Sequence, residues 1–77
     1  MSLENLTLGT EIRDARERAG YTIKKVAEIT RIRETVIANI EADDFSSCGG
    51  NAYARGHIRT IAKVVKLSAD DLIAKFA

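Results

Sequence analysis

Apolar residues recur every three or four positions along most of the chain, and no stretch alternates apolar with polar residues as a half-buried strand does. The 77 residues contain no proline, the residue that most often interrupts a helix. Such spacing is typical of amphipathic helices that each bury one face. We therefore predict an all-α fold, a compact five-helix bundle formed by residues 8–77 as a single domain, with residues 1–7 as a flexible N-terminal tail.

Glycine and capping residues mark the ends of the first three predicted helices. The first is expected over residues 8–19, because Gly20 supplies a stop after them. Thr22 is the expected N-cap of a short second helix that ends near residue 29, and the third helix is expected over residues 33–42. The residues expected on their buried faces are Leu8, Ile12, Ala15, Ala19, Val26, Ile29, Val36, Ile37 and Ile40.

The run SSCGGN at residues 46–51 is the one clear loop in the pattern. Asn51 is the expected N-cap of a fourth helix that continues to about residue 65, and Ser68 begins a fifth helix. The residues expected on buried faces here are Ala54, Ile58, Ile61, Ala62, Val65, Leu72, Ile73 and Phe76, with Phe45 closing over the core. Gly56 falls inside the fourth helix at a cost of about 1 kcal/mol relative to alanine, so we expect it to pack closely against a neighbouring helix.

Charge is distributed unevenly along the chain, although the formal net charge is only +1. Residues 51–66 carry four basic residues and no acid, whereas residues 41–50 carry three acids and no base. A larger basic excess is expected of proteins that bind DNA strongly without sequence preference, because affinity scales with the number of phosphates neutralised. The composition therefore argues mildly against nucleic acid as the main partner.

The sequence contains no recognisable catalytic or metal-binding pattern. No nucleophile is paired with a base, there is no phosphate-binding loop, and Cys48 and His57 are each the only residue of their type. A lone cysteine forms no intrachain disulfide, which fits a reducing compartment such as the cytoplasm. We therefore predict a cytoplasmic binding domain that has no enzymatic activity and needs no cofactor, metal or small-molecule substrate.

Two expected helices joined by a short turn, TIKKVAEITRIRETVIANIEA at residues 22–42, form a helix-turn-helix pattern. Together with the string YARGHIRTIAKVVKLSADDLIAKF at residues 53–76, this pattern makes most of the chain similar to the cytoplasmic domain of RodZ-type bacterial cell-shape proteins, which have the Cro and phage-repressor fold. The resemblance implies a domain that docks the actin-like filament protein MreB or another cell-division partner. It also implies that any membrane span lies in a downstream segment absent from this chain.

In that family the docking surface lies around the fourth helix, in the pattern Tyr-Ala-Arg-Gly-Phe-Leu-Arg-x-Tyr. The chain keeps residues 53–56 and Arg59 of this pattern, and has His57 and Ile61 where the family has aromatic side chains. Helical spacing places Tyr53, His57 and Val64 on one flank, with Ile61 at its border. We predict that these four residues form the protein-docking surface and that His57 and Val64 are substantially exposed. The cationic residues Arg59 and Lys63 are expected on a separate solvent-facing edge.

The repressor resemblance keeps a second hypothesis open, a DNA-binding transcriptional regulator that reads bases with the third helix. It implies base-reading positions at Glu34, Thr35 and Asn39. Arg31 and Arg33 lie close enough to the same edge to contact the phosphate backbone. The binding expected from this face is weak and carries little sequence information.

The same superfamily resemblance implies an ion pair between Arg16 and Glu41. Arg16 lies four residues before the Gly20 stop, and Glu41 lies near the end of the third helix. We therefore expect a partly buried contact at hydrogen-bond distance that ties the first helix to the third.

Overall fold

The computed structural model describes residues 7–76, which form five α-helices and one short 3-10 helix with no strand among them. The elements are α1 (Leu8–Arg18), α2 (Ile23–Thr30), α3 (Glu34–Glu41), η2 (Ser46–Cys48), α4 (Asn51–Val65) and α5 (Ala69–Phe76). The predicted all-α, five-helix fold with a helix-turn-helix is confirmed. Residues 1–6 of the predicted tail and residue 77 lie outside the described residues.

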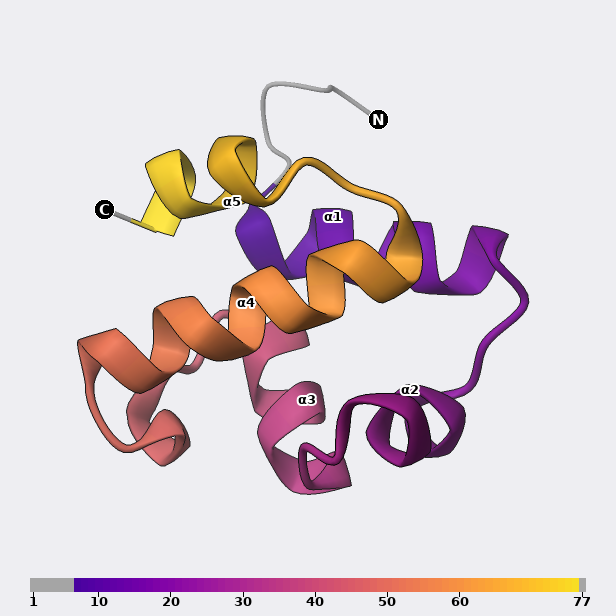
Figure 1. Ribbon diagram of the computed structural model, residues 1–77, viewed down its shortest axis with the longest axis horizontal. Helices are drawn as coiled ribbons and strands as arrows, with labels where there is room; N and C mark the ends of the chain where they lie inside the picture. The colour runs from indigo at the N-terminus through magenta and orange to yellow at the C-terminus, as the bar shows by residue number, and fades with distance from the viewer. Residues whose placement is uncertain (1–6, 77) are drawn as a thin grey trace.

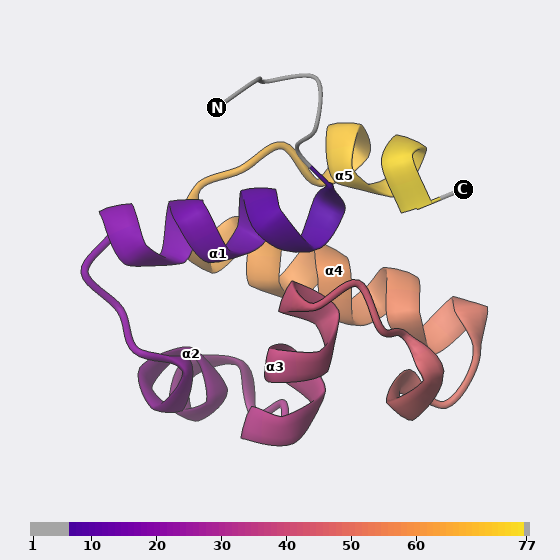
Figure 2. The same ribbon diagram turned by 180° about the vertical axis from the view of Figure 1, so that it is seen from behind.

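The longest helix, α4, is the element around which the others are arranged. It packs against α1, α2, α5 and η2, and α1 also packs against α3. Figure 1 shows α4 crossing in front of α1, with α5 above them and the α2–α3 pair below. Figure 2, seen from behind, shows α1 in front of α4 and the same α2–α3 pair underneath. One face of α4 is therefore buried, and the opposite face is left to solvent.

Branched aliphatic side chains fill the centre of the molecule. The largest fully buried side chains are Val26, Ile12, Ile37, Ile40, Ile58, Ile61 and Leu72. Each contributes about 1.5–3 kcal/mol of transfer free energy, which acts against the conformational entropy that the chain loses on folding. Phe45 packs edge-on against Phe76, with ring centroids 4.9 Å apart. That contact agrees with the prediction that Phe45 closes over the core.

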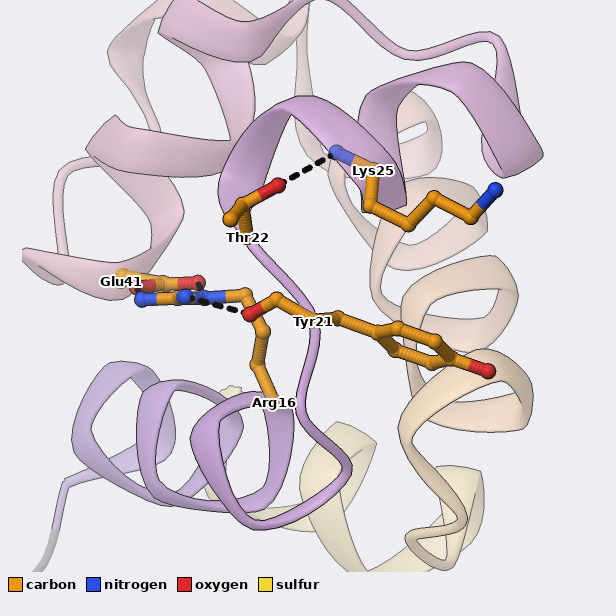
Figure 3. Close-up of polar contacts among 5 residues, drawn as sticks. All are labelled: Arg16, Tyr21, Thr22, Lys25 and Glu41. Atoms are coloured by element: carbon orange, nitrogen blue, oxygen red, sulfur yellow. Dashed lines mark hydrogen bonds and ion pairs between the residues drawn. The ribbon is translucent and has the colours of Figure 1, made fainter.

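Side-chain caps define three of the helix starts. Thr22 Oγ1 accepts a hydrogen bond from the Lys25 backbone N–H at 3.0 Å, as predicted (Figure 3). Ser68 accepts one from the Asp71 N–H at 3.3 Å. Thr7 caps α1 through the Thr10 N–H at 3.1 Å, so it belongs to the helix start rather than to a tail. The prediction for Asn51 was wrong, because Gly50 is the N-cap of α4 and Asn51 is already helical.

Four predictions about packing were also wrong. Ala19 is exposed because α1 ends one residue earlier, and Ile29 is 46% exposed because neither α3 nor α4 covers that side of α2. Gly56 packs against nothing, since a Cβ added there would meet no atom within 4 Å. Cys48 is buried instead of lying in an open loop, and this burial raises the pKa of its thiol. The 3-10 helix η2 carries Cys48 into the core, which the SSCGGN composition did not indicate.

The start of α1 lies directly against the end of α3. A Cβ added to Gly9 would lie 2.5 Å from the carbonyl oxygens of Ile40 and Glu41. The Gly9 N–H donates a hydrogen bond of 2.9 Å to Asp43 Oδ1, and Asp43 itself adopts a left-handed conformation with φ of 62°. Only glycine permits this approach, and sequence reasoning did not single it out.

The predicted contact between Arg16 and Glu41 is present in the structure. Arg16 Nε lies 2.7 Å from Glu41 Oε2, and Arg16 Nη2 lies 3.0 Å from Oε1. Arg16 Nη1 also donates to the Tyr21 carbonyl at 2.9 Å, so the guanidinium joins α3 to the loop that follows α1 (Figure 3). The two side chains are only 11% and 6% exposed, and the hydrogen bonds to Glu41 raise the pKa of Arg16. The pair is therefore desolvated and bidentate.

Replacing Glu41 with alanine should destabilise the fold by about 3 kcal/mol, because it leaves a desolvated guanidinium without its counter-ion. The matched control is Glu11→Ala, which removes the more exposed ion pair between Glu11 Oε2 and Lys75 Nζ at 2.6 Å. That control should cost less than about 1 kcal/mol. Urea unfolding measures both free energies. Equal losses in the two variants would contradict a special role for the Arg16–Glu41 pair.

The two helical glycines Gly9 and Gly56 should respond in opposite directions to alanine. Gly9→Ala should destabilise the fold by about 2 kcal/mol, since its methyl group would overlap the backbone of α3. Gly56→Ala should stabilise it by about 1 kcal/mol, because the added methyl group finds open space and alanine favours the helix. Thermal unfolding of both variants measures these changes, and a loss of stability in Gly56→Ala would show that the face around it is packed.

Candidate binding surface beside α4

The exposed face of α3 offers few groups to read DNA bases. Glu34 and Thr35 are exposed in its first turn, as the DNA hypothesis requires. Asn39 is half-buried, and its Nδ2 donates a hydrogen bond of 2.9 Å to Ser47 Oγ in η2. This exposed bond uses one of the two N–H groups of the amide that was expected to pair with adenine. The other two residues of the predicted reading face supply an acid and a hydroxyl, which add little affinity for a polyanion.

The turn between α2 and α3 is held by its own side chains. The Thr30 hydroxyl donates to the Val26 carbonyl at 2.7 Å and accepts from the Ile32 N–H at 3.2 Å. Arg31 follows in the left-handed conformation, with φ of 63°, and its N–H donates to the Ala27 carbonyl at 2.8 Å. Glycine favours this conformation and other residues occupy it at a cost. The turn thus fixes the backbone of Arg31 while its side chain stays exposed.

The four residues predicted to form the docking surface on α4 differ in how far they are exposed to solvent. Tyr53 is 67% exposed, whereas His57 and Val64 are half-buried rather than substantially exposed. Ile61 is fully buried, which confirms its predicted place on the buried face of the helix and contradicts its inclusion in the docking surface. Its position on the helix turns it toward the centre of the bundle, together with Ile58 one turn earlier.

The cationic edge of α4 lies apart from this flank, as predicted. Arg59 and Lys63 are both exposed. Arg59 Nη1 lies 3.7 Å from Asp70 Oδ1 of α5, and both side chains of that pair are largely in solvent. Such an exposed pair contributes little to stability. The edge is therefore a solvated face with one loose contact to α5.

A shallow hollow connects the helix-turn-helix to α4. It has a volume of about 260 Å³ and is lined by Arg31, Ile32, Arg33, Val36, Ser47 and His57. The two arginines were predicted as phosphate contacts and the histidine as part of a protein-docking surface. The fold brings these residues, which the sequence assigned to separate surfaces, into one place. No signal in the sequence predicted this, because it depends on how the helix-turn-helix packs against α4.

Neither a cluster of metal-binding side chains nor a readily ionised thiol is present among the described residues. Residues 7–76 contain no group of three or more His, Cys, Asp or Glu side chains able to hold a metal ion. The Cys48 thiol is buried with a raised pKa, which lowers its reactivity as a nucleophile. Within the same range, no helix has both the length and the apolar composition needed to cross a bilayer. The candidate site is therefore a surface formed by α4 and the helix-turn-helix.

Comparison with known proteins identifies a family that matches most of this chain. A protein-family model described as a helix-turn-helix domain matches residues 11–72, which includes α2, α3, the turn between them and α4. A search of solved structures found no match to the chain. The family match spans most of the chain and includes every residue that lines the hollow. The chain therefore belongs to this helix-turn-helix domain family.

Proposed function

We propose that this chain is a non-catalytic protein-binding module, the cytoplasmic domain of a RodZ-type cell-shape protein that docks an actin-like filament or cell-division protein. The exposure of Tyr53 is the observation that carries the proposal. Tyr53 and Ile29 are the large hydrophobic residues exposed among residues 7–76, and Tyr53 lies on the outer face of α4. The helix-turn-helix family that matches the chain also occurs in RodZ-like proteins, which supports this assignment.

The surroundings of Tyr53 suit a protein partner. Interfaces gain much of their energy from a few aromatic anchors, and the outer face of α4 has no acid to repel an acidic partner. Gly56 lies one turn after Tyr53 and has open space where a side chain would project. A partner can therefore approach the backbone of α4 closely beside the ring. The half-buried His57 and Val64 extend this surface toward the helix-turn-helix.

Removing the Tyr53 ring should reduce capture of the partner by at least about tenfold, since aromatic anchors commonly contribute 2 kcal/mol or more. The test is co-sedimentation of the purified chain with polymerised MreB from the same bacterium, comparing wild type with Tyr53→Ala. Ile29→Ala is the matched control, because it truncates the other exposed hydrophobic side chain on a different helix. Both variants should melt near the wild-type temperature.

Wild-type chain that stays in the supernatant would contradict the filament as partner. Equal pelleting of wild type and Tyr53→Ala would remove Tyr53 from the interface. If Ile29→Ala loses as much binding as Tyr53→Ala, the binding is not specific to the outer face of α4.

A DNA-binding regulator is the second candidate, favoured by the two exposed arginines at the start of α3. Arg31 and Arg33 form no ion pair with any acid among residues 7–76. Two such cations could contact two backbone phosphates. The reading face between them and Asn39 offers only Glu34 and Thr35, so any contact would be insensitive to base sequence.

The chain should bind mixed-sequence duplex DNA weakly, with affinity falling about tenfold between 50 and 200 mM salt, the slope expected for two phosphate contacts. Fluorescence anisotropy measures this slope. The double substitution Arg31→Gln with Arg33→Gln should flatten it, whereas Asn39→Ala should change little because the Asn39 amide is bonded to Ser47. Tight binding to one duplex sequence that is lost in Asn39→Ala would instead place the DNA-binding function first.

A further inference from the structure

Arg31 occupies a backbone conformation that its side chain makes unfavourable. Its φ of 63° lies in the left-handed region, where glycine has no steric penalty. The conformation serves the C-cap of α2, in which the Arg31 N–H donates to the Ala27 carbonyl, whereas the Arg31 guanidinium forms no ion pair with another described residue and its side chain is exposed. The backbone of Arg31 is therefore fixed by the cap, and its charged group is free to contact a ligand.

The hollow beside Arg31 combines cationic and apolar groups. Arg31 and Arg33 supply two guanidinium groups, and Ser47 and His57 supply a hydroxyl and an imidazole. Ile32 and Val36 form its apolar part, since Ile32 is 8% exposed and Val36 is half-buried. A guanidinium binds a carboxylate through two parallel N–H···O bonds, and an apolar wall accepts the hydrocarbon beside it. A volume of about 260 Å³ suits one side chain rather than a drug-sized ligand.

We propose that this hollow is an acidic side-chain receptor, which takes one Glu or Asp of the protein partner together with an adjoining apolar residue. The proposal rests on the proposed function in taking the partner to be a protein. Arg31 and Arg33 bind the carboxylate, His57 and Ser47 add hydrogen bonds, and Ile32 and Val36 contact the neighbouring apolar side chain. Tyr53 anchors the partner on the outer face of α4, and the hollow fixes its orientation.

Local charge favours a single carboxylate over the phosphates of DNA. Glu34 directly follows Arg33, and Asp44, three residues before Ser47 in the chain, accepts hydrogen bonds from the Ser46 N–H and hydroxyl. These bonds lower the pKa of Asp44 and keep it ionised. A polyanion that extends beyond Arg33 along α3 would also meet Glu34, whereas one carboxylate on an apolar stem meets chiefly the arginines. Apolar Ile32 and Val36 offer nothing to a hydrated phosphate.

The direct test is a nuclear magnetic resonance titration of the labelled chain with the peptide N-acetyl-Leu-Glu-Leu-amide at constant ionic strength. The matched probe, N-acetyl-Leu-Gln-Leu-amide, has the same shape without the charge. We expect saturable shifts in the arginine Nε–H signals of Arg31 and Arg33 and in the ring signals of His57, the one histidine of the chain. The Gln peptide should bind at least about tenfold more weakly, as expected for loss of a charge-assisted contact.

Two glycine substitutions separate charge from backbone strain. Arg31→Gly should raise the melting temperature, because glycine favours the left-handed conformation, and should weaken binding of the Glu peptide about tenfold. Lys66→Gly is the control, since Lys66 ends α4 with φ of 63° and is equally cationic. It should also raise the melting temperature but leave peptide affinity unchanged, because Lys66 does not line the hollow.

Several results would overturn the proposal. Equal binding of the Glu and Gln peptides would mean that the hollow does not select a carboxylate. Shifts spread equally over Arg55 and Arg59, or equal losses in Arg31→Gly and Lys66→Gly, would mean nonspecific attraction to cations. Shifts of the Arg31, Arg33 and His57 signals by a mixed-sequence duplex but not by the Glu peptide would make backbone phosphate the ligand. If wild type pellets with filaments while the peptide fails to bind, the receptor is refuted and the proposed function stands.

Discussion

The Arg16–Glu41 pair is the contact on which the arrangement of this small fold depends. It is the one strongly desolvated ion pair among residues 7–76, and it lies in a molecule whose core otherwise consists of aliphatic side chains. Its bidentate geometry fixes the end of α3 against α1, and the Tyr21 carbonyl extends the contact to the loop before α2. Gly9 brings the backbones of α1 and α3 into contact beside it. The helix-turn-helix is therefore joined to α1 at the end of α3 and at the loop before α2.

The position of the candidate binding surface depends on how the helix-turn-helix packs against α4. Because α4 buries one face against α1, α2 and α5, its opposite face presents Tyr53 and Gly56 to solvent. The helix-turn-helix turn reaches the flank of α4 at His57, which places Arg31 and Arg33 at the same hollow. Asn39, the α3 residue best suited to read a base, is bonded to Ser47 of η2, so a fold used elsewhere to read DNA does not by itself make this chain a DNA reader. Fold alone does not decide function here.

Helical periodicity was enough to predict the five helices, most of the core and the Thr22 and Ser68 caps, because each depends on local spacing and capping chemistry. The family resemblance supplied the Arg16–Glu41 pair, which no local pattern contains. Features set by how helices pack were beyond either source: the partial burial of His57 and Val64, the exposure of Ile29, and the hollow that joins the turn to α4. Gly56 shows the same limit, since the cost of a helical glycine is visible in sequence but its surroundings are not.

The central claim is that this domain docks a protein through the face of α4 beside the helix-turn-helix turn. Site-specific photo-crosslinking in bacterial cells tests it most directly, with benzoylphenylalanine introduced in place of Tyr53 in one protein and in place of Thr35 in another. The account predicts a light-dependent adduct from position 53 with one protein, identified by mass spectrometry as a cytoskeletal or division protein, and none from position 35. An adduct with DNA from position 35, and no protein adduct from position 53, would contradict it.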